Sequence, residues 1–350
     1  MENVISGNHS ILYFVDGNIV IGCRNSAGGM TYFRVHKGYL ASQSTVVSDM
    51  LTLPNDQGNH DTHDGAPLVN FPDSINAEVM ATFLTFFYEP SHDILTPDDT
   101  DLAYKLFDVI VLADMLMVDK LKKSILDRIR QDWAIPTLEE WQRRFTRFNA
   151  EPNKWFYHFY EPASIIRVAQ RFDETLLTPL QFFELSFRDH LLPYRLVPPL
   201  SRDYGYNLPD DRPNPGARWE LITPQDKYRA GHGHRLFLEE FRVRLNGLLC
   251  STENWEPRPN EPCQQLKDGQ DCQTALKERV QDMTLDFLRG CHPFKALAEA
   301  KLGSERNHFF PDGASVTVIH DECADRWDRV LEETLVHLFN KIPLFYTELE

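Results

Sequence analysis

Alternation of polar and apolar side chains marks the first forty positions of the chain. Residues 19–22 are apolar or small, and residues 32–36 alternate in polarity, as in a strand with one face buried. Residues 25–29 between them are Asn, Ser, Ala, Gly and Gly, which favour a loop. The pattern therefore predicts a β-hairpin over residues 17–36.

Helical spacing begins soon after this hairpin. Val46, Val47, Met50 and Leu51 are spaced as on one face of a helix. Ser44 stands just before them and has the side chain of a typical N-cap residue. We therefore expect a helix that starts at Ser44.

Two longer helical segments are predicted at residues 74–90 and 99–135. The second opens with acidic residues, which suit the positive end of a helix dipole. Its apolar residues recur at spacings of three and four, and the pattern restarts after Val118. We expect a helical hairpin broken near Val118, and Pro136 ends the first domain.

The rest of the chain is also predicted to be mainly helical. Two antiparallel helices are expected within residues 162–186, and proline-rich sequence follows them. The expected organisation comprises four parts: a first domain at 1–136, a helical extension at 137–192, a Pro-rich loop at 193–222 and a helical Cys/His-containing domain at 223–350.

Within that last part, capping residues predict a helix from Thr223 to about Leu249. Gly231, His232, Gly233 and His234 lie inside this helix, and we interpret them as an irregularity with solvated imidazoles. Further helices are predicted near residues 273–289 and 323–340.

The first 136 residues resemble a known family in the order of several weak signals. These are the hairpin, the segment Phe33–Lys37, the segment Ala41–Ser44, the strand and helix start at Pro67–Ser74, and the apolar helix that ends at Tyr88. In this order they resemble a BTB/POZ domain. The resemblance implies an α+β fold: an N-terminal BTB domain with a small mixed sheet and clustered helices, followed by a mainly α-helical C-terminal region.

The later segments resemble those of a group of fungal, mostly basidiomycete, BTB proteins. The group has a Pro-Ala-x-x-x-Ile-Arg-x-Ala pattern, present here at 162–169 with altered spacing, and a Leu-x-Pro-x-x-Phe-x-x-Leu-Ser pattern, present at 177–186. The end of the chain, residues 340–346, is similar to the ending of the same group.

The resemblance also implies a role in protein contact. BTB domains pair with themselves or with another BTB protein, so the expected function is an interaction module or adaptor whose C-terminal helices bind a further partner. The alternatives are a substrate adaptor of a cullin-type ubiquitin ligase and a transcriptional regulator that depends on its partner.

The family pattern places the dimer face near residues 11–21 and 36–51. It places the dimer interface and its pocket at five positions. They are Asn18, Val35, His36, Lys37 and Leu40. Many members have an aspartate where this chain has Asn18, so one negative charge of the family's pocket is missing here.

Composition narrows the classes of partner. The formal net charge of −16 argues against direct nucleic-acid binding, since phosphates would be repelled by most of the surface. No apolar run reaches the roughly 20 residues that cross a bilayer, and the start of the chain lacks the features of a secretory signal. We expect an intracellular protein, cytoplasmic or nuclear.

No motif of a nucleophile elbow, phosphate loop, dinucleotide site or zinc hydrolase is present, so neither an enzyme nor a small-molecule substrate is expected. Six cysteines in an intracellular chain are expected to be thiols, and Cys23 to be packed in a strand. We therefore expect no cofactor. The alternative is a structural zinc ion held by the last group of cysteines and a histidine, at Cys263, Cys272, His320 and Cys323.

Overall fold

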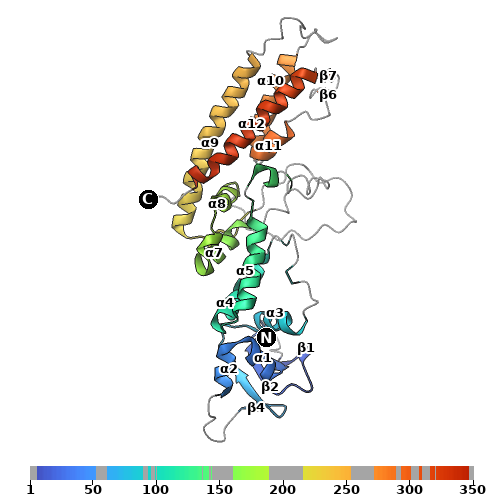
Figure 1. The fold of residues 1–350 in the computed structure, drawn as a ribbon, viewed down its shortest axis with the longest axis vertical. Coiled ribbons are helices and arrows are strands. Elements are labelled where there is room, and N and C mark those ends of the chain that lie inside the picture. Colours follow the sequence, from blue (N-terminus) through green and yellow to red (C-terminus); the bar gives the residue numbers. More distant parts are fainter. Residues whose placement is uncertain are drawn as a thin grey trace. The chain divides into compact units, whose positions relative to one another are not determined.

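The computed structural model divides the chain into two compact units, residues 1–134 and 135–350 (Figure 1). The residues that the structure describes are 6–52, 61–89, 94–95, 99, 101–135, 137–141, 143, 161–188, 216–253, 272–288, 293–300, 307–309, 316–319 and 321–346. The four-part organisation proposed from the sequence is finer than these two units and stays a prediction.

A mixed β-sheet forms one side of the first unit. Strands β2 and β3 are the predicted hairpin and pair antiparallel, from Ile19 with Val35 to Arg24 with Met30. Strand β5 runs parallel to β2, and β1 runs parallel to β3 at one edge. The strand order is β1-β3-β2-β5-β4, and the strands are β1 (Gly7–Tyr13), β2 (Ile19–Arg24), β3 (Met30–Val35), β4 (Thr62–His63) and β5 (Ala66–Asn70).

Five helices are described in this unit: α1 (Lys37–Gln43), α2 (Thr45–Thr52), α3 (Ala77–Tyr88), α4 (Leu102–Met115) and α5 (Asp119–Trp133). The break predicted near Val118 is confirmed, because α4 and α5 are separated by residues 116–118. The N-cap is confirmed too, since the amide of Val47 donates a hydrogen bond to Ser44 Oγ at 3.0 Å. Cys23 is fully buried as expected, and burial raises the pKa of its thiol to about 12.

The second unit is mainly helical, as expected. Its described helices are α7 (Pro162–Phe172), α8 (Pro179–Ser186), α9 (Pro224–Glu253), α10 (Cys272–Leu288), α11 (Pro293–Glu299) and α12 (Asp321–Phe345), with two short 3-10 turns at Glu174–Leu176 and Trp219–Leu221. An antiparallel strand pair, β6 (Asn307–Phe309) and β7 (Val316–Val318), was not predicted. No described helix is apolar enough over its length to be a membrane-spanning segment.

Helix α8 lies at the centre of this unit and contacts α7, α9 and α12. Every residue from Leu180 to Leu185 is buried, as is typical of a helix with neighbours on all sides. The rings of Phe183, Phe237 and Phe294 meet around it, with centroids 4.9 to 6.1 Å apart. This aromatic cluster joins α8, α9 and α11 into one core.

A buried carboxylate fixes the start of α7. The side chain of Glu161 accepts hydrogen bonds from the amides of Ala163 and Ser164 at 3.1 and 2.8 Å, which makes it an N-cap. It also accepts the amide hydrogen of Arg218 at 3.1 Å, and the Arg218 guanidinium lies 3.7 Å away. Glu161 therefore ties the segment before α9 to the beginning of α7.

The interpretation of Gly231, His232, Gly233 and His234 as an irregularity in α9 is wrong. The helix is continuous from Pro224 to Glu253 with no irregularity at residues 231–234. A Cβ atom at Gly233 would lie 2.4 Å from the ring of Tyr346, so glycine is required here for close packing. His234 is half-buried against the ring of Phe187, 4.7 Å away between centroids, so its imidazole is not simply solvated.

We predict opposite effects for two alanine substitutions in this helix. Gly233→Ala should lower the free energy of unfolding by about 1–3 kcal/mol, because the new methyl group overlaps the Tyr346 ring. Gly231→Ala meets no atom within 4 Å and should raise it by about 0.5–1 kcal/mol through helix propensity. Urea unfolding of the full chain, read by pulse-labelled hydrogen exchange in α9 peptides, measures both. Equal effects of the two variants would contradict the close contact with Tyr346.

Candidate interaction site

The end of β3 and the start of α1 form the centre of the candidate site, and four of the five residues named from the sequence meet directly here. The amide of Asn18 donates to the carbonyl of Val35 at 3.0 Å, and Asn18 Oδ1 accepts the amide hydrogen of Lys37 at 2.7 Å. Asn18 thus joins the start of β2 to the first turn of α1. His36 lies between Val35 and Lys37, with its side chain half-buried.

An aspartate that sequence reasoning missed supplies the negative charge beside His36. Asp16 Oδ2 lies 3.2 Å from His36 Nε2, and 84% of the Asp16 side chain is exposed. The hydrogen bond with His36 lowers the pKa of the Asp16 carboxyl from its ordinary value. The negative charge that many family members have at the position of Asn18 is therefore supplied here by Asp16, which is two residues earlier and exposed to solvent.

Aromatic rings hold His36 from the other side. The ring of Phe14 stacks on Tyr88 with centroids 4.9 Å apart, and the His36 ring lies 5.5 and 5.9 Å from these two. The Tyr88 hydroxyl accepts the amide hydrogen of His36 at 3.0 Å, and Tyr39 donates to the carbonyl of Phe87 at 3.0 Å. The end of α3 is thereby tied to the start of α1.

Most of the aromatic residues of α3 lie near its end, where the helix packs against α1. Phe83 is buried in the core, and Phe86, Phe87 and Tyr88 are half-buried. Burial raises the pKa of the Tyr88 hydroxyl. The density of rings near the end of α3, visible in the sequence, was the available signal for the cluster around His36.

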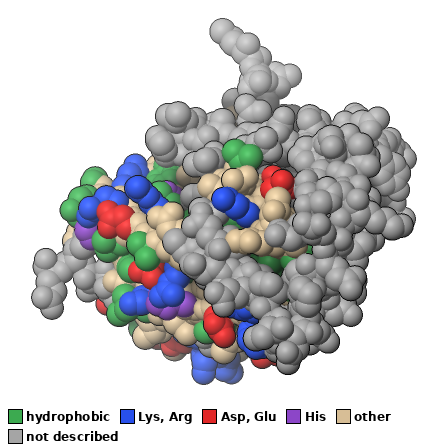
Figure 2. All heavy atoms as spheres, turned by 90° about the horizontal axis from the view of Figure 1, so that it is seen from above, with side chains coloured by type: hydrophobic (Ala, Val, Ile, Leu, Met, Phe, Trp, Pro, Cys, Tyr) green, Lys and Arg blue, Asp and Glu red, His purple; other side chains and the backbone are tan. Residues whose placement is uncertain are grey.

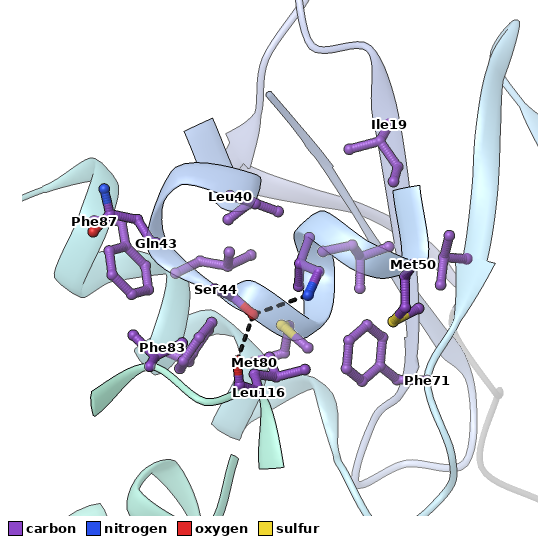
Figure 3. A pocket seen from close by; sticks show the side chains of 15 residues that line it. Ile19, Leu40, Gln43, Ser44, Met50, Phe71, Met80, Phe83, Phe87 and Leu116 are labelled. Carbon is purple, nitrogen blue, oxygen red and sulfur yellow. Dashed lines mark hydrogen bonds between the residues drawn. The ribbon is translucent and has the colours of Figure 1, made fainter. Parts of the chain in front are cut away.

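The fifth residue, Leu40, points into an apolar pocket on the inner side of α1 (Figure 3). The pocket lies between β2, β5 and the helices, and Figure 3 shows Leu40, Met50, Phe71, Phe83 and other side chains around it. Its volume is about 40 Å³. This volume is well below the roughly 150 Å³ of an engineered cavity that binds benzene.

The hydroxyl of Ser44 joins two of the helices around the pocket by hydrogen bonds. Ser44 is buried, donates its hydrogen to the carbonyl of Leu116 after α4, and accepts from Val47 of α2 (Figure 3). It also follows the last residue of α1, and its amide bonds to the carbonyl of Leu40 at 3.1 Å. Ser44 therefore links three helices, α2 and α4 through its side chain and α1 through its backbone amide.

Exposed apolar side chains occur in the two segments that were expected to form a pairing face, residues 11–21 and 36–51. Val15 is 91% exposed at the turn between β1 and β2, and Ile11 is 62% exposed on β1. Tyr39 and Met50, on α1 and α2, are also exposed. Such side chains remain in contact with water unless a partner covers them.

The proposed zinc ligands are described only in part. Cys272 is the first residue of α10 and is fully buried in the core of the second unit, and Cys323 of α12 is half-buried against the same core. Cys263 and His320 lie outside the described residues. Within the described part, no three His, Cys, Asp or Glu side chains are grouped closely enough to hold a metal ion.

Comparison with known families identifies the fold of the first unit. The model of the BTB/POZ domain matches residues 18–132, about a third of the chain, and includes the hairpin, the Ser44 junction and helices α1 to α5 up to Asp132. The chain therefore contains a BTB/POZ domain, followed by a mainly helical C-terminal region. No curated protein and no solved structure was found to match the chain.

We predict that Ser44→Ala destabilises the BTB domain by about 1–3 kcal/mol, because it removes an N-cap and leaves the carbonyl of Leu116 without its buried donor. Ser42→Ala is the matched control, since Ser42 is exposed and should change the free energy of unfolding by less than about 0.5 kcal/mol. Urea unfolding read by hydrogen exchange in α2 peptides measures this difference. Similar values for the two variants would contradict the role of Ser44.

We also predict that the purified chain carries no metal ion. Full burial of Cys272 among apolar side chains favours a neutral packed thiol over a zinc-bound thiolate. Native mass spectrometry of freshly prepared full-length protein should give the mass of the polypeptide alone. A mass higher by one zinc ion, lost on Cys272→Ser, would support the zinc site instead.

Proposed function

We propose that the chain is an adaptor that pairs with a second BTB domain through the surface formed by residues 11–21 and 36–51. A BTB/POZ domain acts in protein interaction in general, and this part of its surface carries exposed Ile11, Val15 and Tyr39. The observation that carries the proposal is Val15, an apolar side chain 91% exposed next to the Asp16–His36 pair.

The site combines apolar and charged groups in the way that interfaces do. Val15 and Tyr39 would supply buried contact area, while Asp16, His36 and Lys37 would lie at its polar rim. Asp16 and Lys37 are opposite in charge and both exposed, so a second copy related by a two-fold axis would present complementary charges. This favours a homodimer, with another BTB chain as the alternative partner.

In this proposal the C-terminal helices bind a further partner, and the protein is intracellular and does not bind nucleic acid directly. The net charge of −16 supports the last point. Figure 2 shows acidic, basic and apolar side chains intermixed on the described part of one face, without an extended basic area.

The fungal type of BTB protein belongs to the proposal as well, on the patterns at 162–169 and 177–186. The cullin adaptor and the partner-dependent transcriptional regulator stay narrower versions of the same adaptor function. No contact among the described residues favours one of them over the other.

Light scattering coupled to size exclusion tests the pairing on the full chain. The unmodified protein should be a dimer at tens of micromolar, and Val15→Glu should raise the dissociation constant at least about tenfold by placing a charge in the interface. Tyr104→Glu is the matched control, because Tyr104 is exposed on α4 outside the proposed surface. A monomer at every concentration, or equal effects of both variants, would overturn the proposal.

A further inference from the structure

The middle of strand β1 leaves its ladder with β3. The two strands pair at Asn8 and again at Tyr13. Residues 9–12 lie between these two points, whereas β3 has only Phe33 there. The backbone of this bulge therefore needs hydrogen-bonding partners other than the β3 ladder.

The side chain of His9 supplies such a partner. Its Nδ1 accepts the amide hydrogens of Ile11 and Leu12 at 3.3 and 3.0 Å. Because a backbone amide can only donate, this nitrogen must carry a free lone pair, and the imidazole must be neutral. The ring is stacked on Phe33, with centroids 5.0 Å apart, so it is held beside the bulge.

The two amides belong to the segment that begins the proposed pairing surface. Leu12 is buried in the core of the first unit, whereas the next residue towards the N-terminus, Ile11, is 62% exposed. The hydrogen bonds to His9 therefore hold the backbone in the shape that buries Leu12 and presents Ile11 to solvent.

We propose that His9 is a proton-sensitive clip, which shapes β1 for pairing while its imidazole is neutral and releases residues 9–12 when the imidazole is protonated. Protonation adds one proton from water to Nδ1, so the acceptor becomes a donor that faces two other donors. The regulation of pairing rests on the proposed function, whereas the clip itself does not.

The direction of the pH effect follows from these contacts. Burial lowers the pKa of the His9 imidazole below its ordinary value of 6.5, against a smaller opposite effect of the Glu89 charge after α3. The clipped form therefore binds a proton less tightly than a released, hydrated form. Release becomes more favourable as pH falls below about 6.5 and levels off below the lowered pKa of the clipped form.

The other ionisable groups beside β1 do not produce the same effect. His63 of β4 lies 3.8 Å from Asp64, so a proton on His63 strengthens their attraction. Hydrogen bonds from Tyr13 and Asn8 lower the pKa of the Asp64 carboxyl, which therefore stays ionised above about pH 5. Arg34 of β3 stays protonated at every such pH. Release in acid is therefore specific to His9.

Hydrogen–deuterium exchange of the full chain, corrected for intrinsic exchange, tests the clip at pH values from about 7.5 to about 5. Protection of the Ile11 and Leu12 amides should fall between about three- and thirtyfold over this range, since one pH unit below 6.5 changes the equilibrium at most about tenfold. Peptides from β2 should stay protected, which distinguishes local release from unfolding of the domain.

Two substitutions separate His9 from the other histidine of the sheet. His9→Asn keeps an acceptor that reaches amides two and three residues further along the chain but does not titrate, so protection should no longer depend on pH. His63→Asn is the matched control, because His63 contacts Asn8 and not the two amides, and it should keep the pH dependence of the unmodified protein.

Light scattering of the same proteins tests the regulation of pairing. The dissociation constant of the unmodified dimer should be at least about threefold higher at pH 5 than at pH 7.5, and His9→Asn should remove this difference. A difference that persists in His9→Asn would assign it to the Asp16–His36 pair and overturn the regulation by His9.

The outcomes distinguish the clip from the proposed function. A monomer at every pH, with protection of the two amides that still falls in acid, would overturn the pairing and support the clip. Protection that does not change with pH in the unmodified protein, or a pH dependence that His9→Asn retains, would overturn the clip itself.

Discussion

Both units depend on one constraint: a polar side chain that is buried must find hydrogen-bonding partners, or the fold loses about 1–3 kcal/mol for each one that does not. Ser44 meets this constraint in the BTB domain because its hydroxyl donates to the carbonyl of Leu116 and accepts from the amide of Val47. Glu161 meets it in the second unit by accepting from three backbone amides. Each of these residues also joins segments that are distant in the sequence, since Ser44 reaches Leu116 and Glu161 reaches Arg218.

The same constraint shapes the candidate pairing surface. Asn18 is exposed, yet its side chain is occupied by the amide of Lys37, so it acts as a local support for α1. The negative charge of the site is Asp16, which is exposed and paired with His36. Because exposed pairs of this kind contribute little to stability, the contact of Asp16 with His36 adds little to the fold. In the proposed pairing, the charges of Asp16 and Lys37 would act mainly on the choice of partner.

Much of the fold was predictable because the strongest periodic signals coincide with the elements that bury a face. The hairpin β2–β3, the break between α4 and α5 and the cap at Ser44 all follow from local patterns. Strand β1 was missed because Leu12 is its sole buried residue and it pairs with β3 only near its two ends. Helix α1 was missed because seven residues with one buried side chain show no period.

The candidate site was predictable to a smaller degree, because its parts meet only in three dimensions. His36, Lys37 and Leu40 could be named from a resemblance, but Phe14, Asp16 and Tyr88 join them through contacts that no spacing encodes.

Gly233 shows most clearly what a local sequence pattern does not predict. Within α9 it reads as a weak point, and the reason for glycine is a ring that lies 113 residues further along the chain. A local sequence pattern depends on the needs of one element, whereas Gly233 and Ser186 are explained by their contacts with Tyr346. The contacts of Tyr346 with Gly233 and Ser186 therefore could not be predicted from the sequence, because they join residues that are more than a hundred positions apart.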